Sequence, residues 1–218
     1  MCRVSSSFFS RLVLNADVLT IRLIVLASLL HVLHEHEYHV LRYNSRGVGT
    51  SSGRSSFTGI EEGKDLEAIV QWAVKEVGGD DGVDIVTIIG YSHGALVATL
   101  HPNLDLPTKT AFVLLSYPLG PRSFLTLFKG SHYDQKLDEL ITDTKSKVFV
   151  AFGGRDEFTS FDRYKTWVEQ LKSKADTAAT QGNSEALRVL SVPEASHFWL
   201  DESNDRLCAE LSSWLASL

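Results

Sequence analysis

The chain has 218 residues, of which 44% are hydrophobic, 22% charged and 10% aromatic, and its formal net charge is -6 at pH 7. These proportions are typical of a globular protein and exclude a disordered or collagen-like chain. Only two cysteines are present, Cys2 and Cys208, which excludes a disulfide scaffold and favours the cytoplasm. With 27 acidic against 21 basic residues and no basic run, neither nucleic acid nor an anionic membrane is expected as a partner.

The length fits a single domain, residues 1–218. Glycine and proline are unevenly distributed along it, because all 15 glycines lie at or after Gly47 and all five prolines at or after Pro102. At average usage such a gap is rare. We therefore treat residues 1–39 as an atypical amino-terminal part of the domain.

The amino-terminal part contains a long apolar stretch, residues 8–33. Its first half, residues 12–26, is predicted to form an irregular hairpin that turns at Asn15, Ala16 and Asp17, and residues 27–36 are predicted to be helical. The uncharged run 23–30 follows Arg11 and Arg22, as the core of a signal peptide or membrane anchor would. It is far shorter than the ~20 residues that cross a bilayer, and no small-residue cleavage site follows. We expect a buried segment of the fold and no membrane partner.

Four histidines and two glutamates between His31 and His39 invite a metal hypothesis. On a helix, His31 would share a face with His34 or Glu35. The spacing matches no compact metal motif, so we expect a solvated helix end, with no metal and no cofactor.

From residue 39 onward, strand patterns alternate with helix patterns. The predicted strands are residues 39–43, 83–89, 111–116, 147–152 and 187–192. The predicted helices are residues 59–77, 94–100, two short pieces within 122–144, 159–174 and 202–218, with a solvated loop at 174–185. The segment 121–144 is long enough only for a small lid. This alternation predicts an α/β fold, a doubly wound, mostly parallel sheet between two helix layers.

Ligands of such sheets bind at the carboxyl ends of the strands, and the turn Gly90-Tyr91-Ser92-His93-Gly94 follows a predicted central strand. The pattern G-x-S-x-G is weak evidence alone, but between a strand and a helix it predicts a sharp turn. Such a turn exposes the Ser92 hydroxyl and points the backbone amide of His93 at an oxyanion. A plain glycine-rich turn is the structural alternative.

An acidic turn follows the strand at residues 147–152, and Asp156 is its best candidate for orienting an imidazole. Glu157 and Asp162 are rivals, and helix capping near Thr159 is the structural alternative for all three. A third turn, after the last strand, contains His197. Of the eight histidines only His93 and His197 lie in such turns, and the His93 side chain must diverge from its neighbour Ser92. His197 is therefore the candidate base.

Residues 46–53 have a rival interpretation as a dinucleotide-binding loop. Their spacing is G-x-G-x-x-x-G rather than G-x-G-x-x-G, and no helix opens directly on them. We expect this loop to shape one wall near the site or simply to turn the chain.

Taken together, these motifs resemble those of α/β-hydrolases without a large cap domain. The resemblance spans residues 40–200 in the family's order and rests on the segment 44–53, the turn around Ser92, the segment 117–120, the turn at Asp156 and the turn 196–198. It implies that Ser92 is the nucleophile, His197 the general base and acid, and Asp156 its orienting partner, acting through an acyl-enzyme. It also implies a small ester, thioester or amide substrate and no cofactor.

Aromatic residues Tyr91, Tyr117, Phe158 and Phe198 lie near the expected pocket and suggest an apolar acyl group. The departure from the family lies upstream, where no glycine precedes Gly47 and the usual glycine-containing oxyanion segment is not recognisable. Loss of one oxyanion donor costs ~100- to 1,000-fold in rate. The alternative function is therefore a hydrolase-fold protein that binds a ligand or partner without turnover.

Overall fold

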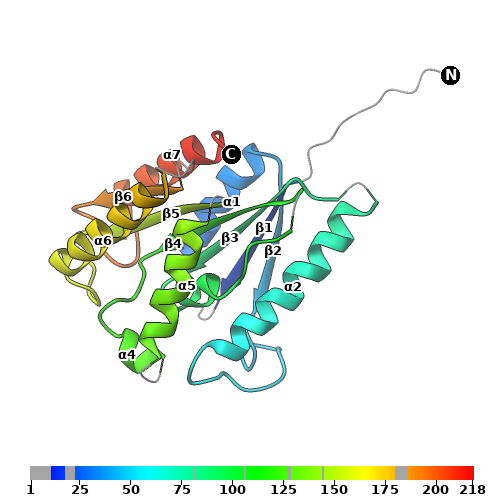
Figure 1. The fold of residues 1–218 in the computed structure, drawn as a ribbon, viewed down its shortest axis with the longest axis horizontal. Coiled ribbons are helices and arrows are strands. Elements are labelled where there is room, and N and C mark those ends of the chain that lie inside the picture. The colour runs from blue at the N-terminus through cyan, green and yellow to red at the C-terminus, as the bar shows by residue number, and fades with distance from the viewer. Residues whose placement is uncertain are drawn as a thin grey trace.

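The computed structural model describes residues 11–17, 23–80, 82–105, 107–126, 129–143, 145–179 and 186–218. They form a six-stranded sheet in the order β2-β1-β3-β4-β5-β6, with each neighbouring pair parallel (Figure 1). The strands are β1 (Arg11–Asp17), β2 (Tyr38–Asn44), β3 (Ile85–Tyr91), β4 (Lys109–Leu115), β5 (Ser146–Gly153) and β6 (Leu187–Val192). The expectation of an α/β fold with a parallel sheet is confirmed.

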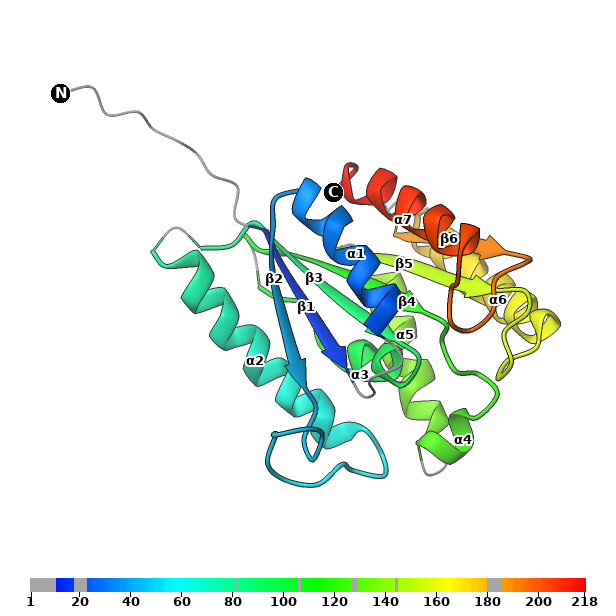
Figure 2. The ribbon, with the colours of Figure 1, turned by 180° about the vertical axis from the view of Figure 1, so that it is seen from behind.

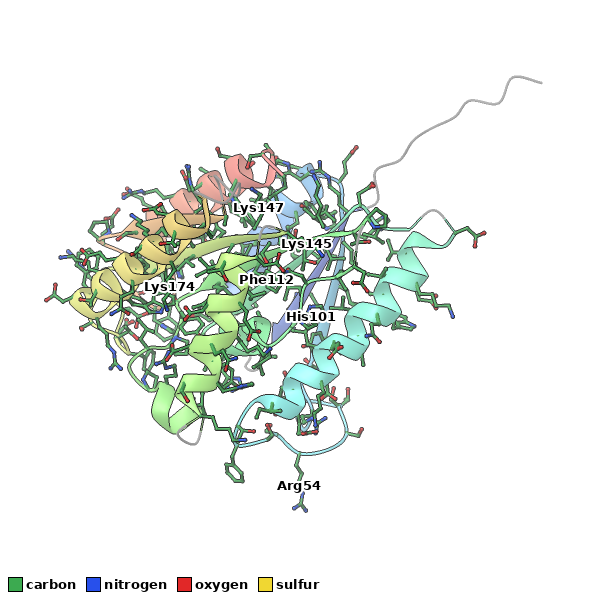
Figure 3. The ribbon with its side chains drawn as sticks, in the orientation of Figure 1. Arg54, His101, Phe112, Lys145, Lys147 and Lys174 are labelled. Atoms are coloured by element: carbon green, nitrogen blue, oxygen red, sulfur yellow. The ribbon has the colours of Figure 1, made fainter. Side chains whose placement is uncertain are left out.

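Helices cover both faces of this sheet (Figures 1 and 2). They are α1 (Leu23–Glu35), α2 (Ile60–Gly78), α3 (His93–Thr99), α4 (Arg122–Leu125), α5 (Gly130–Thr142), α6 (Phe161–Ala179) and α7 (Glu202–Leu215). Helices α1 and α7 pack on one face, and α2, α3, α5 and α6 pack on the other. Phe112 of β4 is one of the side chains that fill the space between the sheet and the second layer (Figure 3).

Both faces of the central strands are buried, which explains their composition. All seven residues of β3 are buried, and so are six of the seven in β4. A strand covered on both sides carries a continuous apolar run, which is why the valine and isoleucine content of β3 predicts a central position.

The uncharged apolar run 23–30 lies in helix α1 and belongs to the core. Val25, Leu26, Leu29 and Leu33 of α1 are each buried in the cluster shared with α7. No helix among the described residues is long and apolar enough to cross a membrane. The expectation of a buried segment is confirmed.

The hairpin predicted for residues 12–26 is wrong. Residues 11–17 form one strand, β1, which lies between β2 and β3 and pairs in parallel with both. Asn15 pairs with Arg42 on one side and with Ile89 on the other, so the expected turn residues lie inside a strand. Pairing on two sides outweighs the local turn preference of asparagine and aspartate.

Two further boundaries differ from expectation. The loop predicted from residue 174 is helical up to Ala179, because α6 continues, and residues 180–185 lie outside the described part. In the segment expected to be a small lid, α5 buries Tyr133, Leu137, Leu140 and Ile141. Burial thus makes α5 a helix of the covering layer rather than part of a lid.

Candidate active site

Three turns at the carboxyl ends of β3, β5 and β6 bring Ser92, Asp156 and His197 together. The Ser92 Oγ lies 3.0 Å from the His197 Nε2, and the His197 Nδ1 lies 2.7 Å from the Asp156 Oδ2. All three side chains are covered, with His197 only 1% and Ser92 5% exposed. A hydroxyl, an imidazole and a carboxylate in this order can transfer a proton from the hydroxyl to the imidazole while the carboxylate holds the other ring nitrogen.

The backbone at Ser92 is strained in the way that a sharp strand-to-helix turn requires. Its φ is 54° and its ψ is -119°, a combination unusual for a residue with a side chain. Two residues earlier, a Cβ on Gly90 would lie 2.3 Å from the carbonyl oxygen of Gly94. Only glycine lets strand β3 and helix α3 approach this closely, and the close approach places Ser92 at the tip of the turn.

The carboxylate of Asp156 is held by several donors. Its Oδ1 accepts hydrogen bonds from the amides of Phe158 and Thr159, at 2.8 and 2.9 Å, and its Oδ2 faces His197. Burial alone would raise the pKa of Asp156, but the contact with His197 and the two amide bonds outweigh it and hold the pKa below the ordinary value. Asp156 is therefore ionised at neutral pH and can stabilise a protonated imidazole.

The two rivals of Asp156 lie elsewhere. The Glu157 Oε2 accepts a 2.9 Å hydrogen bond from the backbone amide of His197, not from its ring. Asp162, in the first turn of α6, pairs with Lys165 at 3.4 Å. The supporting contact of Glu157 has no sequence signal, because it depends on how the two turns pack.

Glycines join the acidic turn to the histidine turn. A Cβ on Gly153 would lie 2.2 Å from the carbonyl oxygen of Ala195, and one on Gly154 would lie 2.4 Å from that of Pro193. Any side chain at either position would push the turns apart. These two glycines therefore set the distance at which Asp156 meets His197.

Buried hydroxyls also hold the backbone of His197. Its carbonyl oxygen accepts hydrogen bonds from the Tyr91 hydroxyl at 2.8 Å and from the Ser116 hydroxyl at 3.2 Å. The indole Nε1 of Trp199 donates to the same Ser116 oxygen at 2.9 Å. Ser116 and Trp199 both have positive φ, 48° and 50°. Strained, buried residues that converge on one carbonyl indicate that its position matters.

Burial corrects the expectation that Tyr91 and Tyr117 contact substrate. Tyr91 is 3% exposed, and its hydroxyl is used by the His197 carbonyl. Tyr117 is fully buried and stacks on Trp167 at 5.0 Å. The Tyr164 hydroxyl lies 2.9 Å from the Tyr117 carbonyl and 3.2 Å from the Asp156 Oδ2. These tyrosines therefore pack beneath the site as part of the core and hold Asp156 in place.

Phe158 and Phe198, by contrast, pack edge-on against the imidazole. The Phe158 ring is edge-on to the His197 ring with centroids 4.7 Å apart, and the Phe198 ring is 5.5 Å away. Phe158 is 49% exposed. Both rings remain candidates for contact with a substrate.

Comparison with solved structures assigns the fold. The esterase Pf2001 of Pyrococcus furiosus matches with a TM-score of 0.70 and 18% identity, over 97% of this chain and 84% of that one. An alpha-beta serine hydrolase homologue from Coxiella burnetii matches with a TM-score of 0.61 and 21% identity, over 96% and 85%. Est1E of Butyrivibrio proteoclasticus matches with a TM-score of 0.68 and 13% identity, over 95% and 87%. This chain has the α/β-hydrolase fold. No protein-family model and no curated protein matches the sequence.

The α/β-hydrolase fold places its oxyanion donors at two points. One is the amide of the residue after the nucleophile, and His93, which follows Ser92, is the first residue of α3. The other comes from the loop after the strand beside the one that precedes the nucleophile. In this chain β1 lies beside β3, with Ala16 paired to Gly90. Residues 18–22, which follow β1, lie outside the described part. A reduced oxyanion hole stays a prediction.

The remaining sequence motifs make other contacts. Residues 46–53 form the loop after β2, where Arg46 makes a bidentate ion pair with Asp65 of α2, with both distances 2.7 Å. His31 lies 3.2 Å from Glu35 on the exposed surface of α1. In the part of the chain that the structure describes, no group of three or more His, Cys, Asp or Glu side chains is placed to hold a metal ion.

Proposed function

We propose that this protein is a serine hydrolase that cleaves carboxylic esters, or the related thioesters or amides, through an acyl-enzyme. The observation that carries the proposal is the continuous hydrogen-bonded line from Ser92 Oγ through the His197 ring to Asp156. The α/β-hydrolase fold supports it, because the line lies at the carboxyl end of the sheet, where this fold has its active site.

The mechanism follows from the roles that each group can take. The His197 Nε2 accepts the proton of Ser92 as Oγ bonds to the substrate carbonyl carbon, and the amide of His93 stabilises the oxyanion. The protonated ring then gives its proton to the leaving oxygen as the carbonyl carbon–oxygen bond breaks. Water then attacks the acyl carbon and gives a proton to the His197 Nε2. The ring returns this proton to the Ser92 Oγ as the acyl–Oγ bond breaks and the acid is released. Asp156 stays ionised throughout and keeps the ring in its productive tautomer.

Hydrolysis of p-nitrophenyl acetate and butyrate tests the proposal. We expect the wild-type protein to hydrolyse both, and Ser92→Ala or His197→Ala to lower kcat/KM by at least ~1,000-fold. Ser146→Ala is the matched control, since Ser146 is a buried serine bonded to Asn103 at 2.9 Å at the opposite end of the sheet. Unchanged hydrolysis in Ser92→Ala would refute the proposal.

A folded wild-type protein that hydrolyses neither ester nor thioester would favour the alternative of ligand binding without turnover.

A further inference from the structure

Three aromatic rings enclose the imidazole of His197, and they differ in exposure. Tyr91 lies 5.3 Å from the imidazole and is 3% exposed, and its hydroxyl donates to the His197 carbonyl. Phe158 and Phe198 lie edge-on to the imidazole, with ring centroids 4.7 and 5.5 Å from it and 6.4 Å from each other. Phe158 leaves about half of its surface free, at 49% exposed. Of the three rings, that of Phe158 is therefore the one with the most surface free to contact a molecule from solvent.

The position of the imidazole divides a substrate into two parts. In the proposed reaction, the acyl part stays bonded to the Ser92 Oγ, and the alcohol part leaves with a proton from the His197 Nε2. The leaving oxygen must therefore come within hydrogen-bond distance of Nε2, on the imidazole's side of the serine. A ring packed against the imidazole contacts the alcohol part rather than the acyl part.

We propose that Phe158, supported by Phe198, determines leaving-group specificity and that the substrates are esters of aromatic or bulky apolar alcohols. This inference rests on the proposed hydrolase function and deepens it. It also moves the apolar preference expected from the sequence from the acyl part to the alcohol part. Edge-to-face contact with a second ring favours an aromatic alcohol by roughly 3- to 10-fold.

A side-chain substitution at Phe158 changes the ring without changing the backbone contact to Asp156. The Phe158 amide donates to the Asp156 Oδ1 at 2.8 Å, and a side-chain substitution leaves this amide in place. Phe158→Ala removes the ring without removing a donor to the carboxylate. Phe158→Leu keeps an apolar side chain there and is the conservative variant.

Benzyl acetate and methyl phenylacetate provide matched substrates, because they are isomers with the ring in the alcohol part or in the acyl part. We expect Phe158→Ala to lower kcat/KM for benzyl acetate by roughly 3- to 10-fold and to leave methyl phenylacetate within about 2-fold. Phe158→Leu should recover part of the loss. Phe57→Ala is the control, because Phe57 is 80% exposed on another loop, and it should change neither value.

The outcomes separate this inference from the function on which it rests. Equal losses for both isomers would mean that the ring only shields the imidazole, and would overturn the inference while leaving the hydrolase function intact. A loss confined to methyl phenylacetate would assign Phe158 to the acyl part and overturn it as well. Hydrolysis of neither isomer nor of any p-nitrophenyl ester by the wild-type protein would overturn the proposed function, and this inference with it.

Discussion

His197 is held through its backbone as well as through its ring. Asp156 fixes the ring, Glu157 accepts from the amide, and Tyr91 and Ser116 donate to the carbonyl. The imidazole lies on a turn, and turns are more mobile than strands. The carbonyl contacts therefore replace the rigidity that a strand would have supplied, and we expect them to affect turnover as well as stability.

Substitution of Tyr91 tests this at the residue scale. Tyr91→Phe removes one of the two hydroxyls on the His197 carbonyl, and we expect kcat for p-nitrophenyl acetate to fall by about 3- to 10-fold with KM unchanged. Tyr38→Phe is the matched control, because Tyr38 is also 3% exposed and its hydroxyl bonds Thr87 at 3.3 Å, away from the site. Urea unfolding should show a loss of about 1 kcal/mol in both variants.

If kcat fell equally in Tyr38→Phe and Tyr91→Phe, the Tyr91 hydroxyl would contribute only to general stability. The same conclusion would follow if kcat fell in neither variant.

The sequence predicts the meeting of Ser92, Asp156 and His197 because each follows a strand of one parallel sheet. It does not predict the direction in which neighbouring aromatic side chains point. Tyr91 is adjacent to Ser92 in the chain, yet its side chain faces the core. Its hydroxyl donates to the carbonyl of His197, which is 106 residues further along the sequence. Contacts of that kind depend on the packing of whole turns, for which no local pattern exists.

At the scale of elements, the turn between β3 and α3 depends on Gly90. In Gly90→Ala the new Cβ would meet the Gly94 carbonyl at 2.3 Å, so strand and helix must separate. We expect a loss of about 1–3 kcal/mol in the free energy of unfolding and a fall in kcat of at least ~10-fold, measured by urea unfolding and ester hydrolysis.

Gly130→Ala is the control for this substitution. A Cβ on Gly130, the first residue of α5, would meet the Arg122 side chain, its nearest neighbour among the described residues, at an ordinary 3.5 Å. Because alanine favours helix over glycine, we expect unchanged or slightly higher stability and unchanged kcat. If Gly90→Ala behaved in the same way, the close approach would not be needed for the site.

Periodic elements are predictable, and elements defined by distant pairing are not. The helical spacing in residues 59–77 predicts α2 to within one residue at each end. Strand β1 has no such signal, because the turn residues Asn15, Ala16 and Asp17 outweigh its short apolar run in sequence. Only the presence of β2 and β3 on its two sides makes it a strand.

For the whole molecule, a buried histidine outside the site sets part of the response to acid. His101, labelled in Figure 3, is 1% exposed, and its Nδ1 donates to the Pro102 carbonyl at 2.6 Å. Burial lowers the pKa of His101 to about 4, against the opposing effect of the Pro102 bond. Below pH ~6.5 the unfolded chain gains a proton at His101 that the folded chain takes up only near pH 4.

Stability should therefore fall as the pH drops through this window. We expect His101 to contribute a loss of roughly 2 kcal/mol in the free energy of unfolding between pH 7 and pH 5. Urea unfolding at both values, in wild-type protein and His101→Asn, isolates this contribution, because all other titrating groups are shared. His31→Asn, at an exposed histidine, is the control. Equal pH dependence in wild type and His101→Asn would contradict the assignment.

Reaction with a fluorophosphonate tests the central claim most directly, since the reagent forms a covalent bond with an activated serine hydroxyl. We predict that mass spectrometry will find one phosphonyl group per chain on Ser92, absent in Ser92→Ala and formed far more slowly in His197→Ala. Ser146→Ala should react as the wild type does. A folded wild-type protein that forms no adduct, or that forms one on another serine, would contradict the account.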